Sequence, residues 1–280
     1  LGVLPLADAL ELVWERGRAM QRHVPRADDG TSGFRLAVLD PSAAGLDDPQ
    51  AEQLVADVAA ATGEVLELVN RNAPGRQHAV AGTVAGLDAL ADALARRRSG
   101  SGDALVLVGG IDVPFHSSVL RPAVADLRAH LDALVPPVVD PALLVGRWVP
   151  NLVGVPFALD ESFVDRVVER GGTRPAPDAG PGERTRHLVI ELLANQLAAP
   201  VQWIDTVRAL VRPAAVGGVG ASRLIEVAPA HAGVLTNLAR SAWAVEPLAG
   251  PPPEALHLER DRDLVLDRVE VEHDDDPGTE

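Results

Sequence analysis

The 280-residue sequence has no cysteine, no tyrosine and no lysine, so all 25 of its basic residues are arginine. The lack of cysteine excludes disulfides, thiolate zinc sites and a cysteine nucleophile. No uninterrupted apolar run reaches the roughly 18 residues of a membrane span, and no basic leader followed by an apolar segment opens the sequence. We therefore expect a soluble, cytoplasmic protein without a membrane span.

Positive charge is also scarce. The 40 acidic side chains give a net charge of −15, and eleven of them lie in residues 254–280. Binding a phosphate backbone needs clustered positive charge, and the only basic run is Arg96–Arg98, so we expect no nucleic-acid partner. His273 and the three aspartates after it lie in the acidic tail, where nothing fixes ligand geometry, so we expect no metal site.

Hydrophobic periodicity organises the segment from residue 34 to residue 109. Short apolar runs typical of strands alternate with helical spacing in the order β-α-β-β-α-β. The strands are expected at 34–39, 65–70, 77–82 and 104–109, and the helices at 48–62 and 84–97. This order is typical of the split, ferredoxin-like arrangement, in which a four-stranded sheet buries one face beneath two helices.

The rest of the chain is predicted to be mainly helical, apart from residues 138–183, which are rich in proline and glycine. One helix is expected to start just after His116, capped by Ser117 or Ser118. Apolar spacing predicts further helices within residues 1–25 and at 185–197, 203–212 and 231–243, and a strand at 224–227. Residues 246–280 lose the pattern of a packed element and are interpreted as a linker.

His116 is the strongest catalytic candidate, because it follows a strand and directly precedes a helix. The partial positive charge of a helix N-terminus disfavours imidazolium, which leaves a neutral base. The alternative is a histidine that caps its own helix. Asp112 is separated from His116 by an extended segment and is not expected to orient it. No serine has the Gly-x-Ser-x-Gly setting of a nucleophile elbow, and Ser32 comes nearest.

Four segments in this order resemble the malonyl/palmitoyl transferase domain of type I fatty acid synthases, of the fungal and actinobacterial kind. They are more distantly similar to stand-alone malonyl-CoA:acyl-carrier-protein transacylases. The segments are Trp14–Gln21, Val69–Gly82, Gly110–Ser117 and Pro200–Trp203, and the resemblance spans nearly residues 1–245. Gly146–Phe157 looks like the version found in giant multienzyme synthases.

The resemblance implies an α/β fold, with an α/β-hydrolase-like acyltransferase core into which the ferredoxin-like subdomain is inserted. Its expected parts are 1–32, a helix of the large subdomain; 33–110, the ferredoxin-like subdomain; 111–245, the rest of the large subdomain; and 246–280, an acidic, proline-rich linker. The serine of the family's elbow and its oxyanion loop would lie before Leu1, so this chain alone is expected to be inactive.

The resemblance also assigns residues. His116 is the expected general acid/base, and Arg16 is expected to bind the free malonyl carboxylate bidentately, although on residue type alone it is a surface charge. Asn70 and Asn72 are expected to support substrate binding, the alternative being a strand-end turn. Phe115 resembles the bulky neighbour of malonyl-selective transferases. Ile225–Pro229 matches the strand whose backbone approaches the histidine in this family, but it departs from the glycine found there in many relatives, which leaves that contact open.

The implied reaction is ping-pong transfer of malonyl from coenzyme A to a serine and then to the phosphopantetheine thiol of acyl carrier protein, with palmitoyl able to leave by the reverse route. No cofactor would be permanently bound. The expected partners are an acyl carrier protein domain, other synthase domains and further copies in a homo-oligomeric multienzyme. The alternatives are an acetyl or general acyl transferase, and a non-catalytic scaffold or carrier-docking domain.

Overall fold

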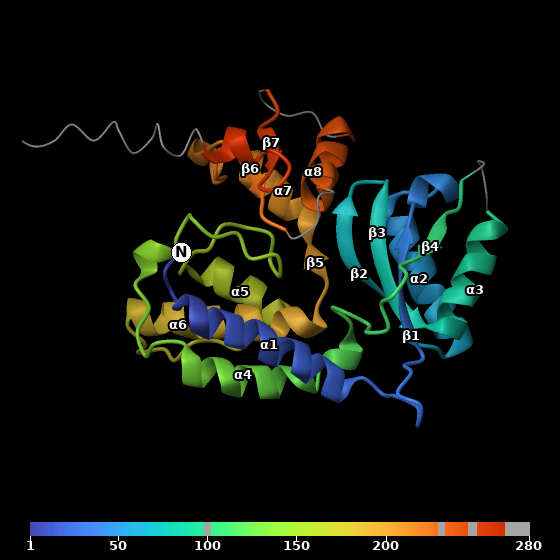
Figure 1. Ribbon diagram of the computed structural model, residues 1–280, viewed down its shortest axis with the longest axis horizontal. Helices are drawn as coiled ribbons and strands as arrows, with labels where there is room; N and C mark the ends of the chain where they lie inside the picture. Colours follow the sequence, from blue (N-terminus) through green and yellow to red (C-terminus); the bar gives the residue numbers. More distant parts are fainter. Residues whose placement is uncertain (98–101, 229–232, 246–250, 267–280) are drawn as a thin grey trace, which may run out of the picture. The chain divides into compact units, whose positions relative to one another are not determined.

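The computed structural model describes residues 1–97, 102–228, 233–245 and 251–266 (Figure 1). The chain divides into two compact units, Leu1–Ala209 and Leu210–Glu280. The first unit holds a five-stranded sheet and a group of helices. The second holds a two-stranded sheet and a helix. None of the helices in these four ranges is long and apolar enough to cross a membrane.

The five-stranded sheet has the strand order β4-β1-β3-β2-β5. Its first four strands and two helices follow one another along the chain as β1 Phe34–Leu39, α2 Asp48–Thr62, β2 Leu66–Ala73, β3 Gln77–Thr83, α3 Val84–Ala95 and β4 Leu105–Leu107. β3 is antiparallel to both β1 and β2, and β4 is antiparallel to β1. The predicted β-α-β-β-α-β order is therefore confirmed. β5, Val201–Gln202, comes from far along the chain and adds parallel to β2.

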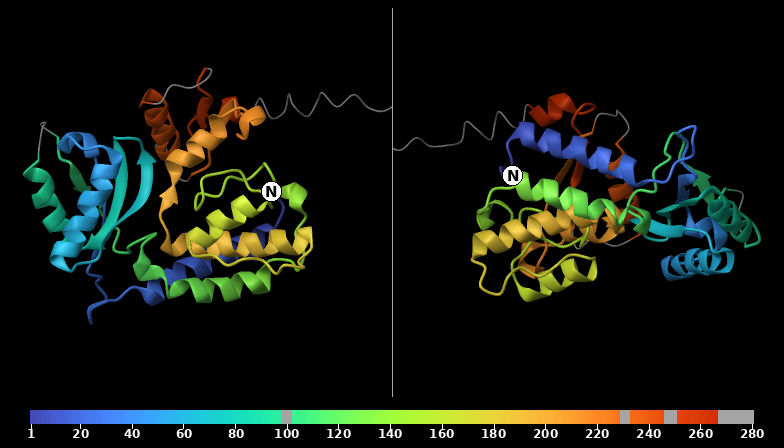
Figure 2. Two further views of the ribbon diagram at one scale, coloured as in Figure 1. Left: turned by 180° about the vertical axis from the view of Figure 1, so that it is seen from behind. Right: turned by 90° about the horizontal axis from the view of Figure 1, so that it is seen from below.

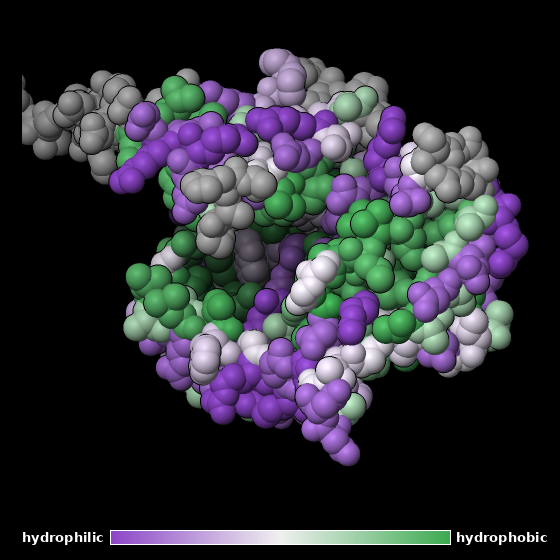
Figure 3. Space-filling model, turned by 45° about the vertical axis from the view of Figure 1, so that its right-hand side comes forward, coloured by the Kyte–Doolittle hydropathy of each residue, from purple (hydrophilic) through white to green (hydrophobic). Residues whose placement is uncertain are grey.

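Local signals set the bounds of these elements. Asp47 caps α2 by accepting the backbone N–H of Gln50, whose side chain in turn accepts the N–H of Asp47, and Gly63 ends the helix at a φ of 70°. α2 and α3 cover one face of the sheet (Figure 2), where the fully buried Leu39, Leu87 and Leu90 lie in one apolar cluster. The opposite face has a small buried apolar cluster of its own. Figure 3 shows apolar side chains over the sheet beside hydrophilic ones.

The other part of the first unit is helical. Its helices are α1 Leu6–His23, α4 Ala123–Leu134, α5 Glu161–Glu169, α6 Pro181–Asn195 and most of α7 Trp203–Val211. α4 packs against both α1 and α6. Leu127 and Leu131, one turn apart on α4, and Leu188 and Leu192, one turn apart on α6, are all buried within the same core cluster. This helical layer supports the loop that carries His116.

Two predictions about the helical layer are wrong. Neither Ser117 nor Ser118 caps a helix: Ser118–Leu120 is a short 3₁₀ helix without a side-chain cap, and α4 begins only at Ala123, after Pro122. The proline-rich stretch 138–183 also contains α5, which was not predicted. Asp160 caps α5 by accepting the backbone N–H of Phe163. Its apolar spacing over nine residues was outweighed in the sequence by the prolines and glycines on either side, which favour loops.

The second unit pairs β6, Arg223–Glu226, in parallel with β7, Glu254–His257. The Glu226 carboxylate accepts the backbone N–H groups of Leu235 and Thr236 in the first turn of α8, Val234–Val245. The linker predicted for 246–280 is therefore wrong for residues 251–266, which contain a strand and buried apolar side chains. The remainder of that segment, with His273, lies outside the described residues.

Candidate active site

His116 sits in a tight turn between β4 and α4. Its φ of 61° makes it the only non-glycine residue with a positive φ in the described ranges. The turn is held on both sides, because the Ser117 hydroxyl donates to the Pro114 carbonyl at 2.7 Å and the Ser118 N–H donates to the Glu67 carboxylate on β2 at 2.9 Å. A left-handed backbone at a residue other than glycine persists where the surroundings impose it, and such sites cluster in active centres.

The hydrogen bond of His116 fixes its tautomer. Its Nδ1 lies 2.7 Å from the backbone carbonyl oxygen of Gln196, just beyond the end of α6. A carbonyl only accepts, so Nδ1 carries the proton, and Nε2 of the neutral ring is left with a free lone pair. The acceptor of Nδ1 is thus the Gln196 carbonyl, and an approach of the backbone of residues 225–229 to the histidine stays a prediction.

The protonation state of His116 follows from its surroundings. Burial lowers the pKa of His116, the hydrogen bond to the Gln196 carbonyl partly opposes this, and the charge of Arg16 lowers it further, to about 4. The imidazole is therefore neutral at pH 7. The helix dipole invoked from sequence is not needed, because α4 begins seven residues after His116. A neutral ring with a free Nε2 is the form that accepts a proton.

This lowered pKa makes the stability of the protein depend on pH. Between pH 6.5 and 4 the unfolded chain binds a proton at His116 that the folded chain does not, so stability falls as the pH drops through this window. We expect this group to account for on the order of 2 kcal/mol of the free energy of unfolding lost between pH 7 and 4.5. Urea unfolding of the protein and of His116→Asn at both pH values measures it. An equal loss in both would contradict the lowered pKa.

Arg16 lies on α1 as a cation that forms no ion pair with any acidic side chain in the described part of the chain. Its Nε is buried and has no hydrogen-bond partner, and burial lowers its pKa. Nearby arginines behave differently, since Arg18 pairs with Glu15 at 2.6 Å. Guanidinium stays charged in proteins, so Arg16 places an uncompensated positive charge close enough to His116 to affect its pKa. An anion is the ligand that this arrangement favours.

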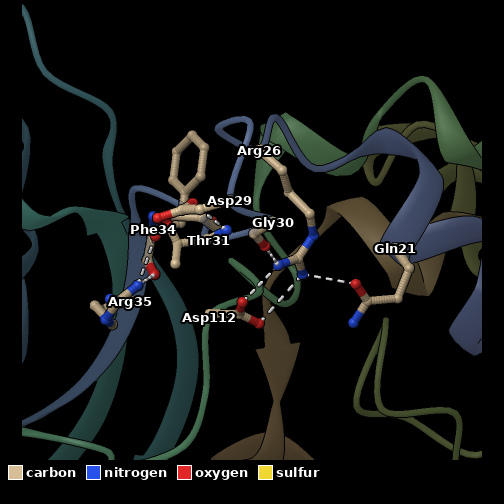
Figure 4. Close-up of polar contacts among 9 residues, drawn as sticks. Gln21, Arg26, Asp29, Gly30, Thr31, Phe34, Arg35 and Asp112 are labelled. Atoms are coloured by element: carbon tan, nitrogen blue, oxygen red, sulfur yellow. Dashed lines mark hydrogen bonds and ion pairs between the residues drawn. The ribbon is translucent and has the colours of Figure 1, made fainter.

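Asp112 does not orient His116. Figure 4 shows its carboxylate turned toward the guanidinium of Arg26, and the shortest bond between them is 2.6 Å. Arg26 also donates to the Gly30 carbonyl and the Gln21 side chain. The ion pair joins the two segments that connect the helices to the sheet, and the hydrogen bond from Arg26 holds the pKa of Asp112 below its ordinary value. Its role is structural, as the extended spacing suggested.

Phe115, directly before His116, lines an open and largely apolar groove of about 680 Å³ beside α1. Val113 and the exposed Leu10, Val13 and Trp14 line the same groove. An acyl chain or an apolar segment of protein suits such a surface.

Asn70 and Asn72 both lie within β2, not in a strand-end turn. Asn70 pairs with Val201 of β5, and Asn72 is only 9% exposed. Among the described residues, no hydrogen bond joins either side chain to His116. Their role in substrate binding stays a prediction.

Sequence reasoning did not find Gln196, because a backbone carbonyl can come from any residue type. It also missed Glu191, Asn195 and Arg121, which lie behind that carbonyl. The sequence does indicate that Glu191 is unusual, because it is the single acidic residue inside the apolar run Leu188–Leu193. In the structure its side chain is only 2% exposed. No group of three metal-ligating side chains lies together within the four described ranges.

The comparison with known proteins finds relatives among fungal synthases, while no family model matches the chain. The chain is 32% identical, over an alignment 315 positions long, to fatty acid synthase 2 of Mycosarcoma maydis, and this alignment covers 96% of the chain and 8% of that protein. It is 33% identical over 208 aligned residues to a fatty acid synthase beta subunit of Emericella nidulans, covering 62% and 11% respectively. The chain thus spans about a tenth of the length of these relatives.

Solved structures share the fold. The malonyl-CoA:acyl carrier protein transacylase of Xanthomonas oryzae matches with a TM-score of 0.64 at 23% identity, over 95% of this chain and 65% of that one. A malonyl-transacylase solved in complex with a type II polyketide synthase acyl-carrier protein matches with the same TM-score at 22% identity, over 94% and 65%. The acyltransferase fold expected from the sequence is confirmed.

Proposed function

We infer that this chain, which is homologous to fungal fatty acid synthase beta subunits and has the fold of malonyl-CoA:acyl-carrier-protein transacylases, carries the base and the anion site of a malonyl transferase. The substrates would be malonyl-CoA and the phosphopantetheine thiol of an acyl carrier protein. One observation carries the proposal: His116 is neutral and held by the Gln196 carbonyl, and its pKa is lowered in part by the charge of Arg16, which has no ion-pair partner among the described residues.

The chemistry of this pair suits acyl transfer with a carboxylated substrate. Nε2 of His116 would take the proton of a serine hydroxyl as its oxygen attacks the thioester carbonyl, and would return that proton to the departing coenzyme A thiolate. In the second half-reaction Nε2 would take the proton of the phosphopantetheine thiol as its sulfur attacks the malonyl ester, and would return that proton to the departing serine oxygen. Arg16 would bind the carboxylate at the far end of the malonyl group.

The serine of this mechanism is proposed to lie outside residues 1–280. The two serines next to His116 are engaged elsewhere: Ser117 is fully buried and donates to Pro114, and Ser118 is bonded to Glu67. Ser32, the best serine by sequence, is 4% exposed and accepts the N–H of Phe34. None of the three is free to attack a thioester.

Intact mass spectrometry after brief incubation with malonyl-CoA tests where the nucleophile lies. We expect no malonyl adduct on residues 1–280, and an adduct on a polypeptide extended upstream to include a Gly-His-Ser-x-Gly segment. The matched control is the extended polypeptide with that serine changed to alanine. An adduct on residues 1–280 would place the nucleophile within this chain and overturn the assignment.

Two alternatives predict different results. An acetyl or general acyl transferase has no need of Arg16, so Arg16→Ala would leave the rate of transfer of its preferred acyl group unchanged. A non-catalytic scaffold would form no adduct in either polypeptide.

We further propose an acyl carrier protein domain and other synthase domains as partners, assembly of several copies, and a cytoplasmic location, with no permanently bound cofactor. The acyl-carrier-protein complex of a protein with the same fold supports the first of these.

A further inference from the structure

A network of buried polar groups lies directly behind the Gln196 carbonyl. It begins at Glu191 on α6, which is 2% exposed. Arg128 on α4 binds the Glu191 carboxylate through two hydrogen bonds, Nε to Oε1 at 2.7 Å and Nη2 to Oε2 at 3.0 Å. Burial alone would raise the pKa of Glu191, but the hydrogen bond and charge of Arg128 outweigh it and the pKa is lowered. The carboxylate is therefore a fixed acceptor.

Glu191 orients Asn195, the last residue of α6. The Asn195 side chain is fully buried, and its Nδ2 donates to Oε2 of Glu191 at 3.0 Å and to the Glu191 carbonyl at 2.9 Å. With its NH₂ group committed to Glu191, its Oδ1 points the other way as an acceptor. Asn195 immediately precedes Gln196, so this side chain also anchors the backbone that presents the Gln196 carbonyl.

Arg121 links that backbone to the loop of His116. Arg121 follows the 3₁₀ helix that begins two residues after His116. Its Nη1 donates to Oδ1 of Asn195 at 3.1 Å, and its Nη2 donates to the Ala198 carbonyl at 2.9 Å. The guanidinium of Arg121, in the chain segment that carries His116, therefore binds residues before and after Gln196. Gly171 leaves room for it, because a Cβ there would lie 2.7 Å from Nη1 of Arg121.

We propose that Arg121 and Asn195, with Glu191 behind them, are positioning residues that set the distance and direction of the Gln196 carbonyl relative to His116. The inference rests on the proposed function for its biological meaning. Two separate sets of hydrogen bonds join the two segments, one from His116 to Gln196 and one from Arg121 to Asn195 and Ala198. Together they restrain both the position and the direction of the Gln196 carbonyl relative to His116. Arg121 touches neither Nε2 of His116 nor Arg16 through any hydrogen bond in the described ranges, so its action is indirect.

Arg121 is the position to change, because its side chain reaches solvent while Asn195 is fully buried. Arg121→Gln removes the guanidinium whose Nη1 and Nη2 donate these two hydrogen bonds. Arg121→Lys keeps the positive charge but not the planar pair of N–H groups. Arg174→Gln is the matched control, since Arg174 pairs with Glu161 and Asp165 on the surface. Urea unfolding of each variant establishes that the fold is retained.

The readout is the ¹⁵N chemical shifts of the His116 ring in residues 1–280, followed through a pH titration. We expect the unchanged protein to show the Nδ1–H tautomer, with a pKa near 4. Both Arg121 variants are expected to show a mixture of tautomers and a pKa raised toward the ordinary value, while Arg174→Gln stays unchanged. The inference is overturned if both Arg121 variants match the unchanged protein, or if Arg121→Lys alone does, because charge rather than geometry would then be responsible.

These measurements do not depend on acyl transfer. If the tautomer depends on Arg121 but the extended polypeptide transfers no malonyl group, the positioning role stands and the proposed function fails. If transfer occurs, Arg121→Gln is expected to lower kcat on the order of tenfold or more with KM unchanged, because a slightly misplaced base slows the chemical step and not binding. An unchanged kcat beside an unchanged tautomer would overturn the positioning role alone.

Discussion

Replacing His116 by alanine is expected to slow malonyl transfer by on the order of 10² to 10⁴ in a polypeptide that carries the serine. The neutral imidazole with its proton fixed on Nδ1 is the group placed to take the serine proton. Without it, the hydroxyl attacks at its ordinary, low nucleophilicity. The measurement is the single-turnover rate of adduct formation from malonyl-CoA, which separates this step from transfer to the acyl carrier protein.

The design of the His116 variants has to respect the backbone at that position. Alanine tolerates a φ of 61° poorly, whereas asparagine is among the residues enriched in this region. His116→Asn therefore removes the base with less strain, and both variants should lose activity alike. His23→Ala is the matched control, because His23 pairs with Asp126 on the surface of α1 and α4. A change below about threefold in the His116 variants would reject the assignment of a general acid/base.

Replacing Arg16 by alanine is expected to abolish the preference for malonyl over acetyl groups. Two charge-assisted hydrogen bonds to the malonyl carboxylate, each of about 1.5–3 kcal/mol, correspond to a loss on the order of 10² to 10⁴ in kcat/KM for malonyl-CoA. Acetyl-CoA has no carboxylate to lose, and its kcat/KM should change little. The ratio of the two kcat/KM values is the quantity to measure.

Two further variants separate charge from geometry at this position. Arg16→Lys keeps the charge but not the fork of donors, and we expect it to recover only part of the malonyl preference. Arg18→Ala, two residues away on the same helix, removes an exposed arginine that pairs with Glu15 and should leave the preference intact. Removing the charge of Arg16 should also raise the pKa of His116 slightly. An equal loss with both substrates would show that Arg16 acts on the fold and not on the carboxylate.

Most secondary structure followed from local signals. The strand at 34–39 and the helix at 48–62 have the predicted bounds, because apolar periodicity, the capping box at Asp47 and the glycine at 63 are all properties of neighbouring residues. The errors fell where local signals conflict. The prolines and glycines around α5 outweighed the apolar spacing of that helix. The many charges of the acidic tail outweighed the short apolar run of β7, whose burial depends on pairing with β6.

The sequence by itself determined the β-α-β-β-α-β order, the absence of thiol chemistry and His116 as the candidate base, and its resemblance to a known family added Arg16. Only the tertiary structure decided what each of them does. The acceptor of His116 is a carbonyl 80 residues away, and the cation that lowers its pKa lies on α1, in another part of the chain. Hydrogen bonding and burial depend on distance in space, which residue spacing along the chain does not encode. For that reason the protonation state of His116, the lack of an ion-pair partner for Arg16 among the described residues, and the buried network next to Gln196 appear only in the folded protein.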